Sequence, residues 1–178
     1  GNYAEIDQGD DAASSVATDN DARITQSDDD NEGFIYQADG GGVATGNTAT
    51  IDQNGTDGYA EIYQGFDEDN SSTDDVAMIT QDALTTDNEA IISQGDQYSG
   101  SVGNNVSRDN EAAITQSGDD NEAEIYQATT DAGAGNNLAD DNDATLIQAG
   151  GDNEARINQG VSNTVSGASA TGATATLT

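Results

Sequence analysis

Hydrophobic and polar residues alternate in short stretches that recur along the whole chain. The pattern Asn-x-Ala-x-Ile-x-Gln occurs in eleven copies, from NYAEIDQ at residues 2–8 to NEARINQ at residues 153–159. Its fixed positions are two residues apart, so their side chains point to the same side of an extended chain, whereas a helix would scatter them around its axis. Each copy therefore predicts a short β-strand with one patterned face.

The spacing of the copies predicts how these strands are arranged. Links of four or six residues alternate with links of nine to fifteen, so the strands come in pairs joined by tight turns rich in Gly, Asp and Asn. One pair cannot bury its own apolar face, but pairs stacked about 4.8 Å apart bond to their equivalents above and below. We predict one all-β domain over residues 1–178, a cross-β, amyloid-like β-solenoid of strand-turn-strand rungs. Its five full rungs are expected at 20–37, 47–64, 75–94, 110–127 and 142–159, with half-rungs at 2–8 and 173–178.

The fixed face of each copy predicts the interior of the solenoid. Ile and Ala fill the space between two columns of strands, while Asn and Gln amides form ladders along the stack. A buried amide without a partner costs about 1–3 kcal/mol, which explains why Gln closes every copy. The residues expected in this core ladder are Asn20, Ile24, Gln26, Asn31, Ile35, Gln37, Ile51, Gln53, Ile62, Gln64, Ile79, Gln81, Ile92, Gln94, Ile114, Gln116, Asn121, Ile125, Gln127, Leu146, Gln148, Asn153, Ile157 and Gln159.

The first copy and the last six residues each predict half of a rung. Residues 2–8 follow the pattern of a second strand without its first, and ATATLT at 173–178 follows that of a first strand without its second. We predict that the last half-rung of one subunit pairs with the first half-rung of the next. The alternative is that both halves cap the solenoid. The expected subunit junction consists of Asn2, Ala4, Ile6, Gln8, Ala175 and Leu177.

Composition alone favours a different answer. A hydrophobic content of 33%, an aromatic content of 4% and a formal net charge of -32 are typical of an acidic disordered chain. The fixed register outweighs this reading, because all Gln residues except Gln97 close a copy of the pattern.

The absence of Cys and His excludes disulfides, thiolate and imidazole metal sites and His-based catalysis. Carboxylates on exposed turns offer no secluded pocket, so we expect no enzyme. Binding to nucleic acid or directly to membranes is not expected either, since both carry negative charge.

Stacked rungs also stack their acidic turns. Like charges one rung apart repel by about 1 kcal/mol even in water, so we expect assembly to depend on salt, divalent cations or acid. The acidic edge is either a solvated surface without a cofactor or a set of turns that hold Ca²⁺ between them. The candidate cation ligands are Asp28, Asp29, Asp30, Asp57, Asp119, Asp120 and Asp152.

Two further groups of residues lie outside the core pattern. Tyr36, Tyr63 and Tyr126 share one outward position of the second strand, where we expect strand packing or contact between fibres. The long links hold isolated aliphatic residues, which we expect to fold back onto the edge of the rungs. These residues are Val16, Val43, Val102, Val106, Leu138 and Val165.

A known repeat family has the same arrangement of Gln, Gly, Asn and Ala. Its pattern Gln-x-Gly-x-x-Asn-x-Ala-x-x-x-Gln is matched by QSGDDNEAEIYQ at 116–127 and by QAGGDNEARINQ at 148–159, including Gly118 and Gly150. The chain therefore resembles the curlin repeats of curli, the amyloid fibre subunits of bacterial biofilm matrix. It departs from them in starting the first strand of each pair with Asn where the family has Ser, and in its longer links.

The resemblance implies a β-solenoid, export across the outer membrane and self-assembly into extracellular fibres. It also implies a nucleator subunit and secretion machinery as partners, besides further copies of the chain. We therefore expect a secreted structural subunit, with its signal peptide already removed, that assembles head-to-tail into curli-like fibres of a biofilm matrix and mediates adhesion and cohesion. The alternative is a monomeric calcium-binding or adhesive β-solenoid module.

Overall fold

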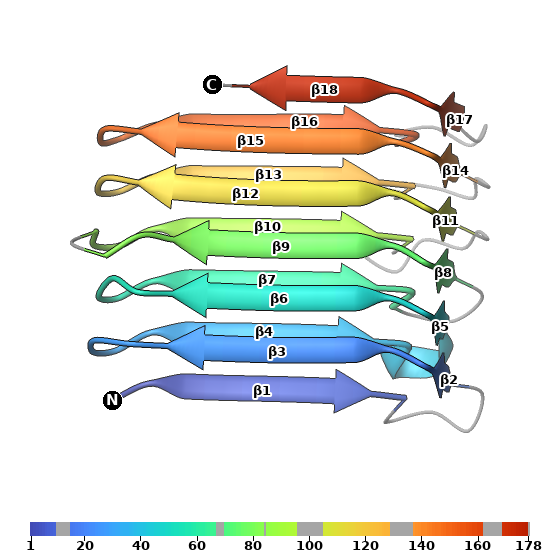
Figure 1. Cartoon of the computed structure of the whole chain (residues 1–178), viewed down its shortest axis with the longest axis horizontal. Coiled ribbons are helices and arrows are strands. Elements are labelled where there is room, and N and C mark those ends of the chain that lie inside the picture. Colours follow the sequence, from blue (N-terminus) through green and yellow to red (C-terminus); the bar gives the residue numbers. More distant parts are fainter. Residues whose placement is uncertain are drawn as a thin grey trace.

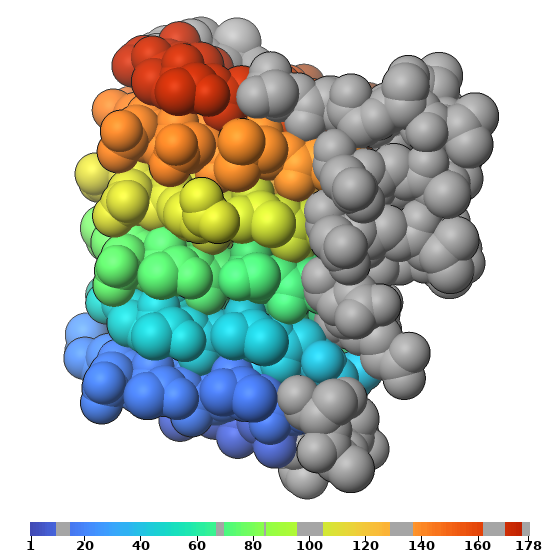
Figure 2. Space-filling view, turned by 90° about the vertical axis from the view of Figure 1, so that its right-hand side faces the viewer, coloured from blue at the N-terminus to red at the C-terminus, as the bar shows by residue number. Residues whose placement is uncertain are grey.

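A computed structural model describes residues 1–9, 15–66, 70–83, 85–95, 105–128, 137–161 and 169–177. It confirms an all-β solenoid of parallel sheets, in which the chain climbs one rung at a time from the N-terminus to the C-terminus (Figure 1). In the space-filling view the rungs form layers that follow the sequence from bottom to top (Figure 2). The only helical element in the described ranges is a single 3-10 turn at Asp39–Gly41.

Three sheets of six strands run along the stack, and we name them by their places in Figure 1. The rear sheet contains β1 (Tyr3–Gln8), β4 (Glu32–Gln37), β7 (Tyr59–Gln64), β10 (Glu89–Gln94), β13 (Glu122–Gln127) and β16 (Glu154–Gln159). The front sheet contains β3 (Asp21–Gln26), β6 (Thr48–Gln53), β9 (Val76–Gln81), β12 (Glu111–Ser117), β15 (Asp143–Ala149) and β18 (Thr174–Leu177). The side sheet contains β2 (Val16–Thr18), β5 (Val43–Thr45), β8 (Ser71–Thr73), β11 (Val106–Arg108), β14 (Leu138–Asp140) and β17 (Ser169–Thr171).

Equivalent residues of successive rungs lie directly above one another. Ile35 of β4 pairs with Ile62 of β7, and Gln37 pairs with Gln64, with the same register in the neighbouring rungs. The front sheet repeats this alignment, with Ile51 of β6 opposite Ile79 of β9. The period-2 pattern of each copy therefore places every Ala, Ile and Gln of a strand on one buried face.

The core is a stack of isoleucines and alanines between the front and rear sheets. The inward-facing Ile side chains are fully buried from Ile35 to Ile125, and Leu146, which replaces Ile in β15, is fully buried too. Each such side chain contributes about 1.5–3 kcal/mol by leaving water. Burial decreases at the bottom of the stack, where Ile24 is only partly buried and Ile6 is 42% exposed.

A residue with positive φ stands at each corner of a rung. Such a backbone conformation is costly for most residues but is tolerated by Gly, Asn and Asp. In the turns that lead into rear strands, this residue is the Asp directly before the Asn of the pattern or its replacement: Asp30, Asp57, Asp87, Asp120 and Asp152. In the turns that lead into front strands, the residue with positive φ is Asp19, Gly46, Asp74, Asp109, Asp141 or Gly172. Directly after the rear strands, the residue with positive φ is Gly9, Ala38, Gly65, Gly95, Ala128 or Gly160.

The side sheet is the feature that the sequence analysis did not predict. Val16, Val43, Val106 and Leu138 do lie on the edge of the rungs, as expected, but as the first residues of its strands. The buried positions of these strands are the next ones, occupied by Ala44, Ser72, Ser107 and Ala139. Val102 and Val165 lie outside the described residues.

Candidate assembly interface

Two ladders of glutamine side chains run along the solenoid axis. In the rear sheet each Nε2 donates to the Oε1 of the next rung, from Gln8 through Gln37, Gln64, Gln94 and Gln127 to Gln159, over 2.6–2.9 Å. In the front sheet the same bonds connect Gln26, Gln53, Gln81, Gln116 and Gln148 over 3.0–3.1 Å. Every amide donates upward, so the solenoid has a chemical polarity: Nε2 donors face the C-terminal end and Oε1 acceptors face the N-terminal end.

The same amides also hold the front and rear sheets together. Gln116 of the front sheet donates to the backbone carbonyl of Asn121, 2.9 Å away at the start of the rear strand. Gln159 of the rear sheet donates to the carbonyls of Asp143 and Ala173 in the front half of the stack, at 3.3 and 3.2 Å. Along the described parts of the chain, no buried side-chain nitrogen or oxygen lacks a hydrogen-bond partner. A hydrophobic side chain could not replace these glutamines, because it would leave several buried polar groups unpaired.

The asparagines form ladders of a second kind. The Oδ1 of Asn20 accepts the backbone N–H of Asn47, and the Oδ1 of Asn121 accepts that of Asn153 one rung above, over 3.0 and 3.2 Å. The side sheet has its own asparagine column, in which Asn105 N–H donates to the Oδ1 of Asn70. The repeat pattern did not predict this column of Asn70, Asn105 and Asn137. The signal was present in the fragments NSST, NVSR and NLAD, which share an Asn followed two residues later by Ser or Ala.

Two glycines interrupt the pattern where space is short. A Cβ at Gly58 would lie 2.5 Å from the Oε1 of Gln81, and one at Gly33 would lie 3.0 Å from the Oε1 of Gln53. At both positions a side chain would therefore crowd a glutamine of the front ladder.

Asp75 is the only carboxylate in the front asparagine column of the described rungs, and its side chain is buried. Its Oδ1 accepts the N–H of Asn110 at 2.9 Å, and its Oδ2 accepts the hydroxyl of Ser72 at 2.5 Å. Burial raises the pKa of Asp75 to about 6, while hydrogen bonds from Ser72, Asn110 and Ser107 oppose that rise. Ser72 and Ser107 occupy side-sheet positions where the neighbouring rungs have Ala44 and Ala139. Two hydroxyl groups are therefore present in the rungs beside the buried carboxylate of Asp75.

The residues at the two ends of the stack are the ones predicted for a subunit junction. We call β1, β2 and β3 the lower edge and β16, β17 and β18 the upper edge. Ala4, Ile6 and Gln8 lie on β1, below Gly33, Ile35 and Gln37. Ala175 lies on β18 in register with Ala144 and packs against the core, and Leu177 is aligned with Leu146. The Oδ1 of Asn2 accepts the N–H of Asn31.

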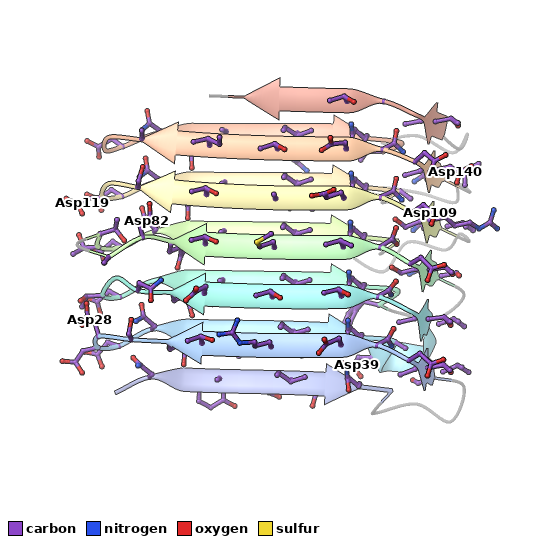
Figure 3. All side chains as sticks on the ribbon, in the orientation of Figure 1. Asp28, Asp39, Asp82, Asp109, Asp119 and Asp140 are labelled. Carbon is purple, nitrogen blue, oxygen red and sulfur yellow. The ribbon has the colours of Figure 1, made fainter. Side chains whose placement is uncertain are left out.

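The candidate cation ligands lie where the front strands turn back to the rear strands. Figure 3 labels two of them, Asp28 and Asp119. Asp28, Asp30, Asp57, Asp120 and Asp152 all have positive φ, so the backbone itself favours Asp at these positions. The other two candidates, Asp29 and Asp119, form hydrogen bonds with neighbouring turns. The backbone carbonyl of Asp29 accepts the N–H of Asp57, and the Oδ1 of Asp119 accepts the N–H of Thr86. Across the described turns, no three acidic side chains come close enough to hold a metal ion. Calcium binding stays a prediction.

The outer face of the rear sheet collects aromatic rings in its lower half. Tyr36 and Tyr63 stack with their centroids 5.2 Å apart, and Phe66 meets both rings edge-on. Burial and nearby carboxylates, including Glu5 and Glu61, raise the pKa of Tyr36 to about 12. Tyr126 lies apart from this group. The guanidinium carbon of Arg156 lies over its ring, 4.4 Å from the ring centroid.

Comparison with known proteins agrees with this geometry. Residues 108–138 match the family described as the curlin associated repeat. This segment begins at the end of β11, includes β12 and β13 and reaches the first residue of β14, so it spans one complete rung. No curated protein and no solved structure matches the chain. No helix of the described residues has the length and apolar character needed to cross a membrane. The chain is therefore a β-solenoid of which residues 108–138 match the curlin associated repeat.

Proposed function

We propose that the protein is a secreted structural subunit that polymerises head-to-tail into curli-like extracellular fibres, which give a biofilm matrix cohesion and adhesion. The curlin repeat and the solenoid fold support a structural role and no enzymatic one. The proposed partners are further copies of the chain, with a nucleator subunit and an outer-membrane export system as the resemblance to curli implies.

The observation that carries the proposal is the complementarity of the two edges. A second copy placed with its lower edge on the upper edge of the first continues all three sheets in register. Gln8 Oε1 of the second copy then receives the upward-directed amide of Gln159, and its Ile6 covers Ile157. The strands β17 and β18 of the first copy and β1 of the second together complete a sixth rung. Strand edges left open in this way are templates for further strand pairing.

Ile6 offers a direct test, because its side chain is 42% exposed in one subunit and becomes buried only in the filament. We expect the wild-type chain to form long filaments in electron micrographs, and Ile6→Asp to remain monomeric with an unchanged far-ultraviolet circular dichroism spectrum. A carboxylate placed between two stacked rungs loses its water and has no partner there.

Ile147→Asp is the matched control. Ile147 is 37% exposed on the outer face of the front sheet, where the filament does not cover it, so this variant should polymerise like the wild type. Filaments of normal length from Ile6→Asp would contradict the proposal. A monodisperse wild-type monomer that requires calcium would instead support the alternative, a calcium-binding or adhesive module.

A further inference from the structure

The chain has only three basic side chains, and one of them lies at the upper edge. Arg23 belongs to the front sheet and Arg108 to the side sheet, whereas Arg156 is on β16, the uppermost strand of the rear sheet. Its outward column contains, from bottom to top, Glu5, Phe34, Glu61, Ile91, Glu124 and Arg156. The column therefore begins with a carboxylate at the lower edge and ends with a guanidinium at the upper edge.

Three contacts already hold the guanidinium of Arg156 in place. Its Nε lies 3.3 Å from the Oε2 of Glu124 and donates to the Oδ1 of Asn158 at 3.1 Å, while the group packs on the ring of Tyr126. The side chain nevertheless stays 47% exposed, because no strand covers it from above. A guanidinium has five N–H donors, so donors remain for a second carboxylate. Since the side chain is already ordered, a further partner meets little additional loss of side-chain entropy.

We propose that Arg156 is the polarity clamp of the filament, pairing with Glu124 of its own chain and with Glu5 of the next copy. The inference rests on the head-to-tail assembly proposed above. If β1 of the next copy lies on β16 in the register of the other rungs, Glu5 stands directly above Arg156 at a strand spacing of about 4.8 Å. Glu5 is held in place by the hydroxyl of Tyr3, 2.6 Å from its Oε2. Elsewhere on this face the junction adds no like-charge pair, because Tyr3 meets Glu154 and Asp7 meets Asn158.

Charge exchange between two variants tests the clamp. Arg156→Glu alone would place two carboxylates opposite each other at the junction, and Glu5→Arg alone would place two guanidinium groups there. Directly opposed like charges destabilise strand pairs, so each variant should elongate about tenfold more slowly than the wild type at low salt. In an equimolar mixture every upper edge finds a complementary lower edge on the other variant. Elongation should then return to within about twofold of the wild-type rate, in filaments whose two kinds of subunit alternate.

The mixture also separates the clamp from simple misfolding, since a variant that fails to fold cannot be rescued by another. Arg108→Glu is the control: it changes the net charge as much as Arg156→Glu does, but on β11, which pairs with strands of its own chain on both sides. Elongation of this variant should stay within about twofold of the wild type. Seeded elongation can be followed by light scattering and checked by electron microscopy with one variant labelled. The clamp would be overturned if the wild type forms filaments and each single variant elongates at the wild-type rate. It would also be overturned if the mixture elongates no faster than either variant alone. If the wild type forms no filaments, the proposed function fails, and this inference fails with it.

Discussion

The side chain of Asp75 shows how one residue can depart from the repeat without breaking it. It stands where the rungs below and above have Asn47 and Asn110. Like the Oδ1 atoms of these two residues, its Oδ1 accepts the backbone N–H of the residue one rung above. A carboxylate cannot donate as an amide does, and Ser72 meets its second oxygen with a hydroxyl instead. From the sequence this position was only an irregular copy of the pattern, because the two serines lie in segments that appeared to be links.

The buried acid predicts an unusual dependence of stability on pH. The pKa of Asp75 rises from 3.8 to about 6 on folding, so between these values the folded chain keeps a proton that the unfolded chain releases. The free energy of unfolding should therefore fall as the pH rises from about 4 to about 6, by up to about 3 kcal/mol from this group. Asp75→Asn should remove this contribution and be the more stable protein at pH 7.

Denaturant unfolding of the monomer at pH 4, 5, 6 and 7 measures this effect. Asp141→Asn is the matched control, since it removes one charge at an exposed corner and keeps a residue type that tolerates positive φ. The account of Asp75 is wrong if both variants show the same slope of stability against pH.

The glutamine ladder should contribute to the stability of the single subunit. Gln81→Leu removes the acceptor of Gln53 and the donor to Gln116, and it also leaves the carbonyl of Asn88 without this bond. Buried polar groups without partners cost about 1–3 kcal/mol each, so the free energy of unfolding should fall by about 3 kcal/mol or more. Among the described residues, Gln8→Leu at the open edge removes only the bond to Gln37, so it should cost about 1 kcal/mol in the monomer. Equal losses in the two variants would show that the ladder is not the reason for the fixed glutamines.

At the scale of elements, the strands followed from the sequence more completely than the turns and links did. The alternation in NEAEIYQ and its equivalents predicted both long sheets and which residues they bury, since a period of two leaves one solution. The side sheet was missed because three-residue strands such as VSR hold one inward residue, too few for alternation to be seen. The turns were recognised from their Gly, Asp and Asn residues, but the particular Asp that takes positive φ at each corner was not predicted, because a local sequence does not reveal which backbone angle the next rung imposes.

The positive φ angles at the corners of the rungs predict that backbone conformation, and not calcium binding, is the reason for Asp at these positions. Asp120 is exposed at positive φ, so Asp120→Asn should keep the wild-type melting temperature, with and without calcium. Asp120→Val should lose about 1–3 kcal/mol, because a β-branched residue is strained there. Glu122→Val, two residues later in an exposed strand position, should be close to neutral. A calcium-dependent stabilisation of the wild type that Asp120→Asn abolishes would argue for a metal site instead.

At the scale of the whole molecule, charge opposes what the strand edges favour. A subunit with a formal net charge of -32 must approach another of the same charge, and columns such as Glu89, Glu122 and Glu154 stack like charges within each subunit. In the proposed assembly, we expect the acidic surface to keep single subunits apart at low salt, and the ladders and the isoleucine core to stabilise the filament. If the chain polymerises as proposed, we therefore expect ionic conditions to control its polymerisation.

Salt should therefore accelerate assembly. Raising the ionic strength from about 0.01 to about 0.1 M shortens the screening length from about 30 to about 10 Å, and the elongation rate should rise steeply across this range. Sodium and calcium chloride should act alike at equal ionic strength, apart from the stronger screening by a divalent ion. Micromolar calcium that triggers assembly at constant ionic strength would favour specific calcium sites.

If subunits stack end to end and share a sixth rung, this stacking sets the axial repeat of the filament. Cryo-electron microscopy or fibre diffraction should show rungs about 4.8 Å apart along the fibre axis, with six rungs and about 29 Å per subunit. A repeat of five rungs per subunit, or strands that do not run across the fibre axis, would contradict the account.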